Sequence, residues 1–250
     1  MARTSDHTGS TQTRSTTSEP SLMQHPGSAA QQRSDASDAD DGDTAILVPR
    51  RRPAQQRSRE KFARMLEAAR SVLVDHGFES FTFDEVAKRA EVPIGTLYQF
   101  FANKYVMICE LDRQDTAVIV AELKKWPSRD PSIQWPDFLD NFIDHLAQLW
   151  KADPSRRAVW HAIQSTPATR ATGAATESEL LDLLAEVLIP LAPTLPLPER
   201  RKHAGILVHT ATSLLNFAVR DATASPETYL TTVEEIKRML IAYLFSVAQG

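Results

Sequence analysis

The sequence has one cysteine, no long apolar run and none of the common signatures of enzymes. The lone Cys109 excludes a disulfide framework within the chain and is typical of a reducing compartment. No apolar stretch approaches the about 20 residues of a membrane-spanning helix, and the polar N-terminus lacks the apolar core of a signal peptide. We therefore expect a soluble, cytoplasmic protein that has no membrane partner.

Enzyme chemistry finds little support in the residue pattern. The seven histidines form no HExxH motif and no metal-ligand spacing with cysteine, and the GxxxxGK, GxGxxG and GxSxG motifs are absent. We therefore expect no catalytic residues, no metal and no cofactor. Cys109 could act as a redox sensor at a junction between domains, but a lone helical cysteine is more often inert.

The charges are unevenly distributed, although the formal net charge is only −4. Residues 1–49 carry a net charge of −4, residues 50–104 of +4 and residues 105–250 of −4. A basic segment between two acidic ones suits a local contact with nucleic acid, because nearby cations drive phosphate binding. A basic face that is merely solvated is the alternative.

The first part of the chain is rich in Ser, Thr, Gln, Asp and Gly and has few apolar residues before Ile46. It cannot bury enough surface to offset the entropy of ordering, so we expect residues 1–53 to be a disordered acidic tail ending in a basic arm. The arm, Arg50-Arg51-Arg52, is either a flexible limb that reaches the minor groove or a solvated linker that adds non-specific attraction.

From Ser58 onward the apolar residues recur at helical spacing, and no period-two alternation is bounded by hairpin turns. Asn103 is a suitable N-cap for a long helix that runs to about Trp126. Prolines near the starts of most later helices mark their boundaries. We predict an all-α protein of about nine helices, with an N-terminal three-helix domain at residues 54–103 and a helical C-terminal domain at residues 104–250.

Two short helices joined by a turn of about three residues stand in the basic segment. Thr82-x-x-Glu85 is a capping box that opens the first, and Pro93 is well placed as the first residue of the second. This is the geometry of a helix-turn-helix, which presents its second helix to the major groove. Leu97 and Phe101, four residues apart, should face the core.

The other positions of the second helix are expected to face DNA. Because Gly95 has no side chain, the backbone there can come close to a phosphate or a base, while Thr96 and Gln99 can reach base edges. Tyr98 offers a hydroxyl to phosphate, and Phe100 is also expected to point outward. Lys104 begins the next helix, where its charge and the free N–H groups attract phosphate. A purely structural three-helix unit is the alternative.

Residues 64–107 resemble the N-terminal domain of tetracycline-repressor (TetR) family regulators. The marks of the resemblance are Ala68-Ala69, Gly77-Phe78, Thr82 with Val86-Ala87, Gly95-Thr96-Leu97-Tyr98, Phe101 and Asn103-Lys104. The resemblance implies a homodimeric transcriptional repressor that leaves its operator when a small molecule binds the C-terminal domain. It also implies DNA contacts at Thr82, Pro93, Gly95, Thr96, Tyr98, Phe100 and Lys104.

Three residues depart from the pattern of that family. Glu91 stands where the turn usually has glycine, which would be strained if the residue is left-handed. Pro93 replaces a usual serine and removes a hydroxyl contact. Phe100 stands where a polar or histidine side chain is common, so it either packs on sugar or a thymine methyl group or turns inward.

The last two helices, at about 198–221 and 226–248, have apolar faces wider than one partner helix would cover. Two such helices from each subunit could form a four-helix interface, which the resemblance also implies. Packing within their own domain is the alternative. A symmetric dimer would read a palindromic operator in double-stranded DNA, with recognition helices roughly 34–36 Å apart.

An effector site would consist of apolar side chains with a few polar groups. The candidates in the C-terminal part are Phe142, His145, Trp150, Trp160, His161, Gln164, Asn216 and Phe217. Each is more often an ordinary core or surface residue, and the set suggests an apolar or aromatic effector.

We therefore read the chain as a ligand-responsive regulator in which effector binding moves the fourth helix and changes the spacing of the recognition helices. A protein–protein adaptor whose helix-turn-helix is only structural is the second hypothesis. A helical enzyme that degrades an effector is the third, and it lacks a nucleophile–base pair. The sequence leaves open the operator, the effector and whether the regulator represses or activates.

Overall fold

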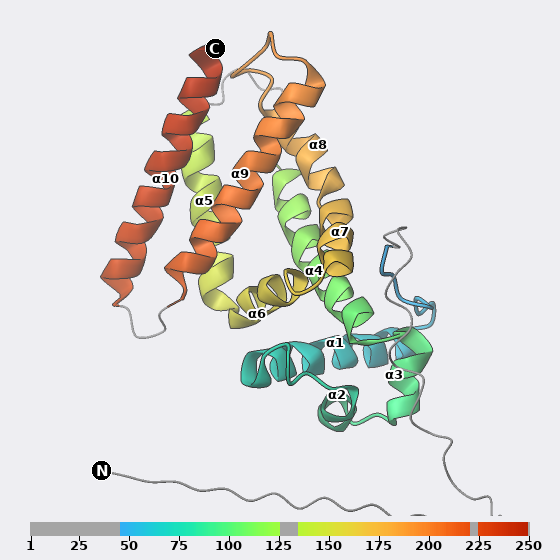
Figure 1. Ribbon diagram of the computed structural model, residues 1–250. Helices are drawn as coiled ribbons and strands as arrows, with labels where there is room; N and C mark the ends of the chain where they lie inside the picture. Colours follow the sequence, from blue (N-terminus) through green and yellow to red (C-terminus); the bar gives the residue numbers. More distant parts are fainter. Residues whose placement is uncertain (1–45, 126–134, 221–224, 250) are drawn as a thin grey trace, which may run out of the picture. The chain divides into compact units, whose positions relative to one another are not determined.

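The computed structural model describes residues 46–125, 135–220 and 225–249, all within the unit that spans residues 43–250. All regular secondary structure in these residues is helical, so the predicted all-α fold is confirmed (Figure 1). The first 45 residues of the predicted acidic tail and the predicted helix end near Trp126 lie outside the described residues.

Ten helices follow one another along the described residues. They are α1 (Gln56–His76), α2 (Phe83–Ala90), α3 (Ile94–Phe100), α4 (Lys104–Leu123), α5 (Trp135–Ala152), α6 (Pro154–Ile163), α7 (Pro167–Thr176), α8 (Ser178–Val187), α9 (Leu197–Ala218) and α10 (Pro226–Gln249). None of them is both long and apolar enough to cross a membrane.

The helix beyond the expected nine is α7, whose sequence PATRATGAAT has no apolar stripe. A capping box between Thr166 and Thr169 opens it, and the buried Thr169 hydroxyl donates to the Ile163 carbonyl oxygen at 2.8 Å. A Cβ atom added to Gly173 would lie 3.1 Å from Ile163, so glycine permits close packing against α6. Small and hydroxyl residues thus form this helix, which hydrophobic periodicity does not detect.

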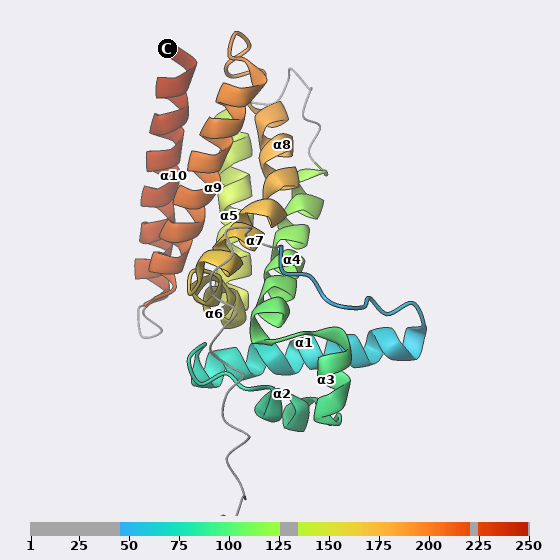
Figure 2. The ribbon, with the colours of Figure 1, turned by 45° about the vertical axis from the view of Figure 1, so that its right-hand side comes forward.

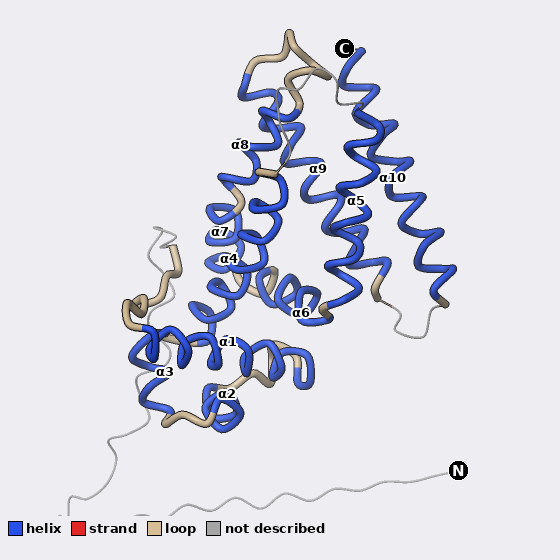
Figure 3. Tube along the Cα trace, turned by 180° about the vertical axis from the view of Figure 1, so that it is seen from behind, coloured by secondary structure: helices blue, strands red, loops and turns tan. Residues whose placement is uncertain are grey.

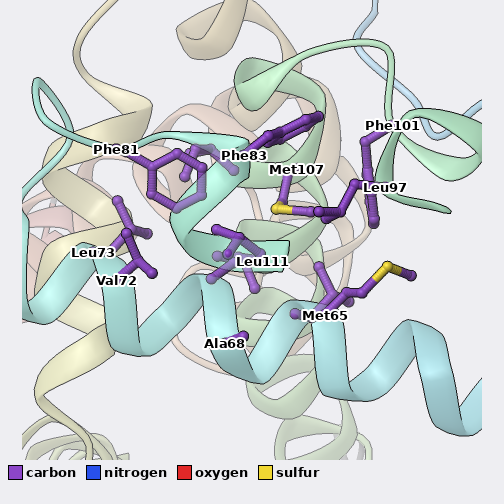
Figure 4. Close-up of a cluster of buried hydrophobic side chains, with 14 of the residues drawn as sticks. Met65, Ala68, Val72, Leu73, Phe81, Phe83, Leu97, Phe101, Met107 and Leu111 are labelled. Atoms are coloured by element: carbon purple, nitrogen blue, oxygen red, sulfur yellow. The ribbon is translucent and has the colours of Figure 1, made fainter. Parts of the chain in front are cut away.

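The first core joins α1, α2 and α3 to the first half of α4. Figure 4 shows the side chains that meet there, among them Met65, Val72, Phe83, Leu97, Phe101, Met107 and Leu111. α6 extends the same core through Val159, Ala162 and Ile163. Helix α1 therefore lies across the start of α4 and beneath α6 (Figure 2).

The second core lies among α5, α8, α9, α10 and the second half of α4. Helices α5, α9 and α10 run side by side, as seen from behind in Figure 3. Leu111 belongs to the first core and Val120 to the second, so one continuous helix, α4, enters both.

A largely shielded ionic contact ties three helices together. Asp115 on α4 accepts a hydrogen bond from the Arg70 guanidinium of α1 at 2.8 Å, and Arg156 of α6 lies 3.6 Å from the same carboxylate. Arg70 also donates to the Ser155 hydroxyl at 3.0 Å. Because the Arg70–Asp115 pair is largely shielded from water, α1, α4 and α6 are held in one arrangement.

Candidate nucleic-acid interface and internal cavity

Helix α2 is fixed at both ends. The Thr82 hydroxyl accepts a hydrogen bond from the Glu85 amide, which is one half of the predicted capping box, whereas the Glu85 carboxylate binds Arg89. At the other end, Arg89 donates to Ser71 of α1 at 2.8 Å and to Glu85 at 3.0 Å, and it also pairs with Asp75. The hydrogen bond from Arg89 lowers the pKa of Glu85. These contacts hold α2 against α1.

The turn between α2 and α3 contains the left-handed residue that its length requires. Glu91 has φ 54° and ψ 46°, and its N–H donates to the Lys88 carbonyl oxygen. The Val92 N–H then closes the turn on the Ala87 carbonyl oxygen at 3.0 Å. A side chain in this conformation costs roughly 1–2 kcal/mol relative to the right-handed one, so Glu91 stores strain where glycine would not.

Helix α3 begins one residue later than predicted. Pro93 has an extended ψ of 139° and is the N-cap, not the first helical residue. Its carbonyl oxygen accepts the Thr96 N–H at 2.8 Å. The difference has a local cause. Pro93 still belongs to the extended end of the turn at Glu91, and helical angles begin only at Ile94.

Most of the predicted reading residues lie on an accessible face. The exposed residues are Thr82 before α2, Pro93 before α3, and Gly95, Tyr98 and Gln99 on α3. Thr96 is half-buried. A Cβ atom added to Gly95 would meet no atom of the chain within 4 Å. The chain itself therefore does not require glycine at this position.

Phe100 faces inward, so the predicted outward orientation is wrong and the alternative that it turns inward holds. Its side chain is only 5% exposed and packs edge-on against Phe62, with the ring centroids 5.4 Å apart. Phe100 lies three residues after Leu97 and shares its inward face. Phe101, just beyond the helix, stacks on Phe62 with the ring centroids 5.1 Å apart and lies 6.4 Å from the Phe100 ring, so the three rings form one cluster.

Lys104 occupies the predicted first position of α4, and the Asn103 side chain caps that helix by accepting the Val106 N–H at 3.0 Å. The Lys104 ammonium group donates to the Phe78 carbonyl oxygen at 3.3 Å and lies 4.4 Å from the centre of the Phe78 ring. In this arrangement the side chain binds the loop after α1.

A cavity of about 50 Å³ lies inside the second core. Helices α4, α5, α8, α9 and α10 contribute its walls, which are leucine, isoleucine, valine and aromatic side chains with one hydroxyl, that of Thr212. Trp150 lines the cavity, and its indole N–H is buried without a hydrogen-bond partner among the described residues. The side chains that line the cavity are thus apolar apart from that of Thr212.

Two family models match the chain. Residues 65–111 match "Bacterial regulatory proteins, tetR family", and residues 133–248 match "Tetracyclin repressor-like, C-terminal domain". The chain belongs to the TetR family of transcriptional regulators.

A curated relative is the HTH-type transcriptional repressor KstR of Rhodococcus jostii (strain RHA1), which is 25% identical over 138 residues. That match covers 54% of this chain and 63% of KstR, so the chain spans less than two thirds of the length of this relative.

Solved structures share the fold over most of their length. The regulator FadR from Bacillus subtilis, in complex with stearoyl-CoA, has a TM-score of 0.60 and 16% identity, covering 72% of this chain and 97% of FadR. A TetR-family regulator from Streptomyces coelicolor has a TM-score of 0.54 and 26% identity, covering 76% of this chain and 98% of that one.

The cavity of this TetR-family chain includes only two of the predicted effector residues. Phe142 and Trp150 line it, whereas the other six candidates do not. Those six lie elsewhere: His145 near Glu122, Trp160 and His161 on α6, Gln164 just after α6, Asn216 buried on α9, and Phe217 exposed at the end of α9. The principal missed residues are aliphatic, such as Ile119, Leu184 and Leu207, whose sequence pattern equals that of ordinary core.

Cys109 is fully buried in α4. Burial and the nearby Asp112 carboxylate raise the pKa of the Cys109 thiol to about 11. Because the thiolate is the reactive form, this cysteine has the properties of an inert core residue.

The basic arm is bound to the protein. Arg50 donates to the Tyr98 carbonyl oxygen at 3.1 Å, and Arg52 pairs with the buried Glu110 at 3.1 Å. Arg51 is exposed and has no ion pair or hydrogen bond within the described part of the chain. The flexible-limb interpretation therefore does not describe Arg50 and Arg52 in this arrangement.

Proposed function

We propose that this chain is a transcriptional repressor that binds a palindromic operator as a homodimer and leaves it when an apolar effector enters the cavity. The exposed face of α3 is the observation that carries the proposal. Gly95, Tyr98 and Gln99 are exposed there, and open space at Gly95 would let DNA approach the backbone.

We assign base reading to Thr96 and Gln99, and backbone contacts to Thr82, Pro93, Gly95, Tyr98 and Lys104. A glutamine side chain suits the N6 and N7 atoms of adenine, whereas hydroxyl, N–H and ammonium groups suit phosphate. Lys104 would have to release the Phe78 carbonyl oxygen or extend from it to reach DNA. We retain the division into a DNA-binding domain at 54–103 and a ligand-binding and dimerisation domain at 104–250.

The dimer contact is assigned to α9 and α10. Ile206 and Phe217 lie about three turns apart on one face of α9 and are about half exposed, and Met239 of α10 is 56% exposed. Large apolar side chains that are left open on two long helices favour a partner helix pair. A symmetric pair would set the spacing of the two α3 helices, which must lie roughly one turn of DNA apart.

The effector is assigned from the walls of the cavity. Aliphatic and aromatic side chains favour an apolar molecule. The structure of FadR with stearoyl-CoA is an example of this fold with a ligand that has a long apolar chain. Among the described residues no charged side chain lines the cavity, so the part of the effector held there should be uncharged.

Effector binding must enlarge the cavity. Its volume of about 50 Å³ is far below the about 300–1,000 Å³ typical of pockets for small molecules. Ile119 of α4 forms part of the wall, so enlargement would displace α4 and change the spacing of the recognition helices. The effector then favours the state that does not fit the operator.

A binding selection on random duplex DNA tests the proposal. The full chain is purified and the selection is run at two salt concentrations. A recovered palindrome with half-sites about one helical turn apart is the expected result. Weak binding without sequence preference at both salt concentrations would contradict it and would favour the adaptor hypothesis.

A second step tests the effector. Apolar compounds, including long-chain acyl-CoA thioesters, are added to the protein–operator complex. Release of the operator by an apolar compound, together with loss of that release in the Ala211→Trp variant that fills the cavity, is the expected result. A regulator of bacterial DNA would act in the cytoplasm, and we propose that location and no catalytic role.

A further inference from the structure

The segment that precedes α1 is anchored along its length. Residues 46–53, here called the strap, have no regular secondary structure and lead from α4 and α7 to the start of α1 (Figure 2). The strap contacts three helices that are far from it in sequence.

Its upper end is bound by the C-terminal part of the chain. The Leu47 N–H donates to the Thr172 hydroxyl of α7 at 3.0 Å, and Arg113 of α4 donates to the Leu47 carbonyl oxygen at 3.5 Å. The Leu47 side chain is half-buried against the first core. Both backbone polar groups of this residue are therefore bound by other helices.

The middle of the strap binds the recognition helix. The Arg50 N–H donates to the Phe100 carbonyl oxygen at 2.8 Å, and the Arg50 guanidinium donates to the Tyr98 carbonyl oxygen at 3.1 Å. The last carbonyl groups of a helix lack partners within it, and α3 has no basic residue in its last turn. Arg50 supplies both hydrogen bonds and a positive charge at the negative end of α3.

The lower end of the strap is fixed to α4. Arg52 pairs with Glu110 at 3.1 Å, and the Glu110 side chain is 5% exposed. Arg113 pairs with the same carboxylate. Arg113 thus contacts Glu110 and the Leu47 carbonyl oxygen, and so connects two anchors of the strap.

We propose that the strap sets the position of α3 relative to α4 and α7, and that Arg50 is the positioning residue that holds the C-terminal end of α3. The proposal rests on the proposed function of α3 as the recognition helix. A seven-residue helix has little stability of its own, so contacts at its end determine its orientation. The strap also gives α7 a direct connection to α3 that bypasses the body of α4.

Arg51 provides a matched control. It neighbours Arg50 and carries the same charge, but it is exposed and has no partner within the described residues. If the arm only attracted DNA, Arg50→Ala and Arg51→Ala would weaken binding alike. Each would also reduce the slope of log affinity against log salt by about 0.9 for every phosphate that the variant no longer neutralises.

The first experiment measures binding of full-length variants to the operator duplex recovered with the wild type, over a series of salt concentrations. Arg50→Ala is expected to weaken binding about tenfold with an unchanged salt slope, and Arg51→Ala less than about threefold. Equal losses of affinity in the two variants, or a slope reduced by about one in Arg50→Ala, would overturn the proposal.

Hydrogen exchange in the absence of DNA separates this inference from the proposed function. Amides of residues 97–103 are expected to exchange faster in Arg50→Ala than in the wild type and in Arg51→Ala. Unchanged exchange in Arg50→Ala would overturn the proposal that Arg50 positions α3. A wild-type protein that binds no duplex would refute the proposed function. The exchange result would still decide whether Arg50 holds the C-terminal end of α3.

The upper anchor has its own test. Thr172→Val removes the acceptor of the Leu47 N–H, Thr172→Ser keeps it, and Thr176→Val alters the same helix without touching the strap. Faster exchange in residues 97–103 is expected in Thr172→Val alone, together with weaker operator binding. Equal behaviour of the two valine variants would show that α7 does not act through the strap.

Discussion

Replacing Glu91 by glycine should stabilise the protein relative to replacing it by alanine. Glu91 is the one non-glycine residue with a positive φ among the described residues. Alanine keeps the left-handed strain of roughly 1–2 kcal/mol, whereas glycine removes it. Glycine also adds freedom to the unfolded chain, which costs about 0.5–1 kcal/mol. The Glu91→Gly variant should therefore exceed Glu91→Ala by about 0.5–1 kcal/mol in free energy of unfolding.

Urea unfolding of the two variants measures this difference at one pH and salt concentration. Both variants lack the carboxylate, so charge effects cancel in the comparison, and backbone strain and the freedom of the unfolded chain remain. The difference corresponds to a midpoint shift of about 1–4 °C in a thermal scan for a chain of this size. A Glu91→Gly protein no more stable than Glu91→Ala would show that the strain in the turn does not exceed the about 0.5–1 kcal/mol that glycine costs through the unfolded chain. Operator binding should strengthen in both, because each loses a negative charge beside α3.

Three further changes follow from buried groups. Phe100→Ala should lower the free energy of unfolding in urea by about 3–5 kcal/mol, whereas Gln99→Ala, at an exposed position, should change it by less than about 0.5 kcal/mol. Similar small losses in both variants would show that Phe100 faces outward. Burial and the carboxylates of Glu177 and Asp115 raise the pKa of Asp112 from 3.8 to about 7, so its contribution to stability is present below pH 3.8 and lost as pH rises to 7. Asp112→Asn should remove that decline, and an unchanged pH profile would contradict the assignment. Trp150→Phe removes an N–H that has no partner within the described residues and should change stability by less than about 1 kcal/mol; a larger loss in urea unfolding would show that this N–H is hydrogen-bonded.

The helix-turn-helix could be predicted because its signals are local. Thr82 and Asn103 are followed three residues later by the amides that they cap, and such pairings depend only on neighbouring residues. The orientation of Phe100 could not be read in the same way. In a seven-residue helix, positions 97, 100 and 101 all lie near the inner face, and Phe62 decides which aromatic rings are buried.

The cavity and the strap were beyond sequence patterns for a different reason. Apolar periodicity identifies the buried face of α5 or α8 but does not distinguish a residue beside a void from one in close packing. Leu184 and Leu207 therefore gave no signal, and the aromatic residues Phe142 and Trp150 were the candidates found. In the strap, the partners of Leu47 and Arg50 are 125 and 48 residues away and belong to irregular coil contacts that no period encodes.

Movement at the cavity has a short path to the recognition helix. Ile119 lines the cavity and Leu111 lies in the first core, eight residues or about 12 Å along α4. Asp115 lies between them and binds Arg70 of α1, so a shift of α4 carries α1 with it. Helix α1 holds α3 through the contact of Phe62 with Phe100. A displaced α4 would thus move α1 and α3 as one body, and in a symmetric dimer the two α3 helices would change their separation while each kept its own reading face.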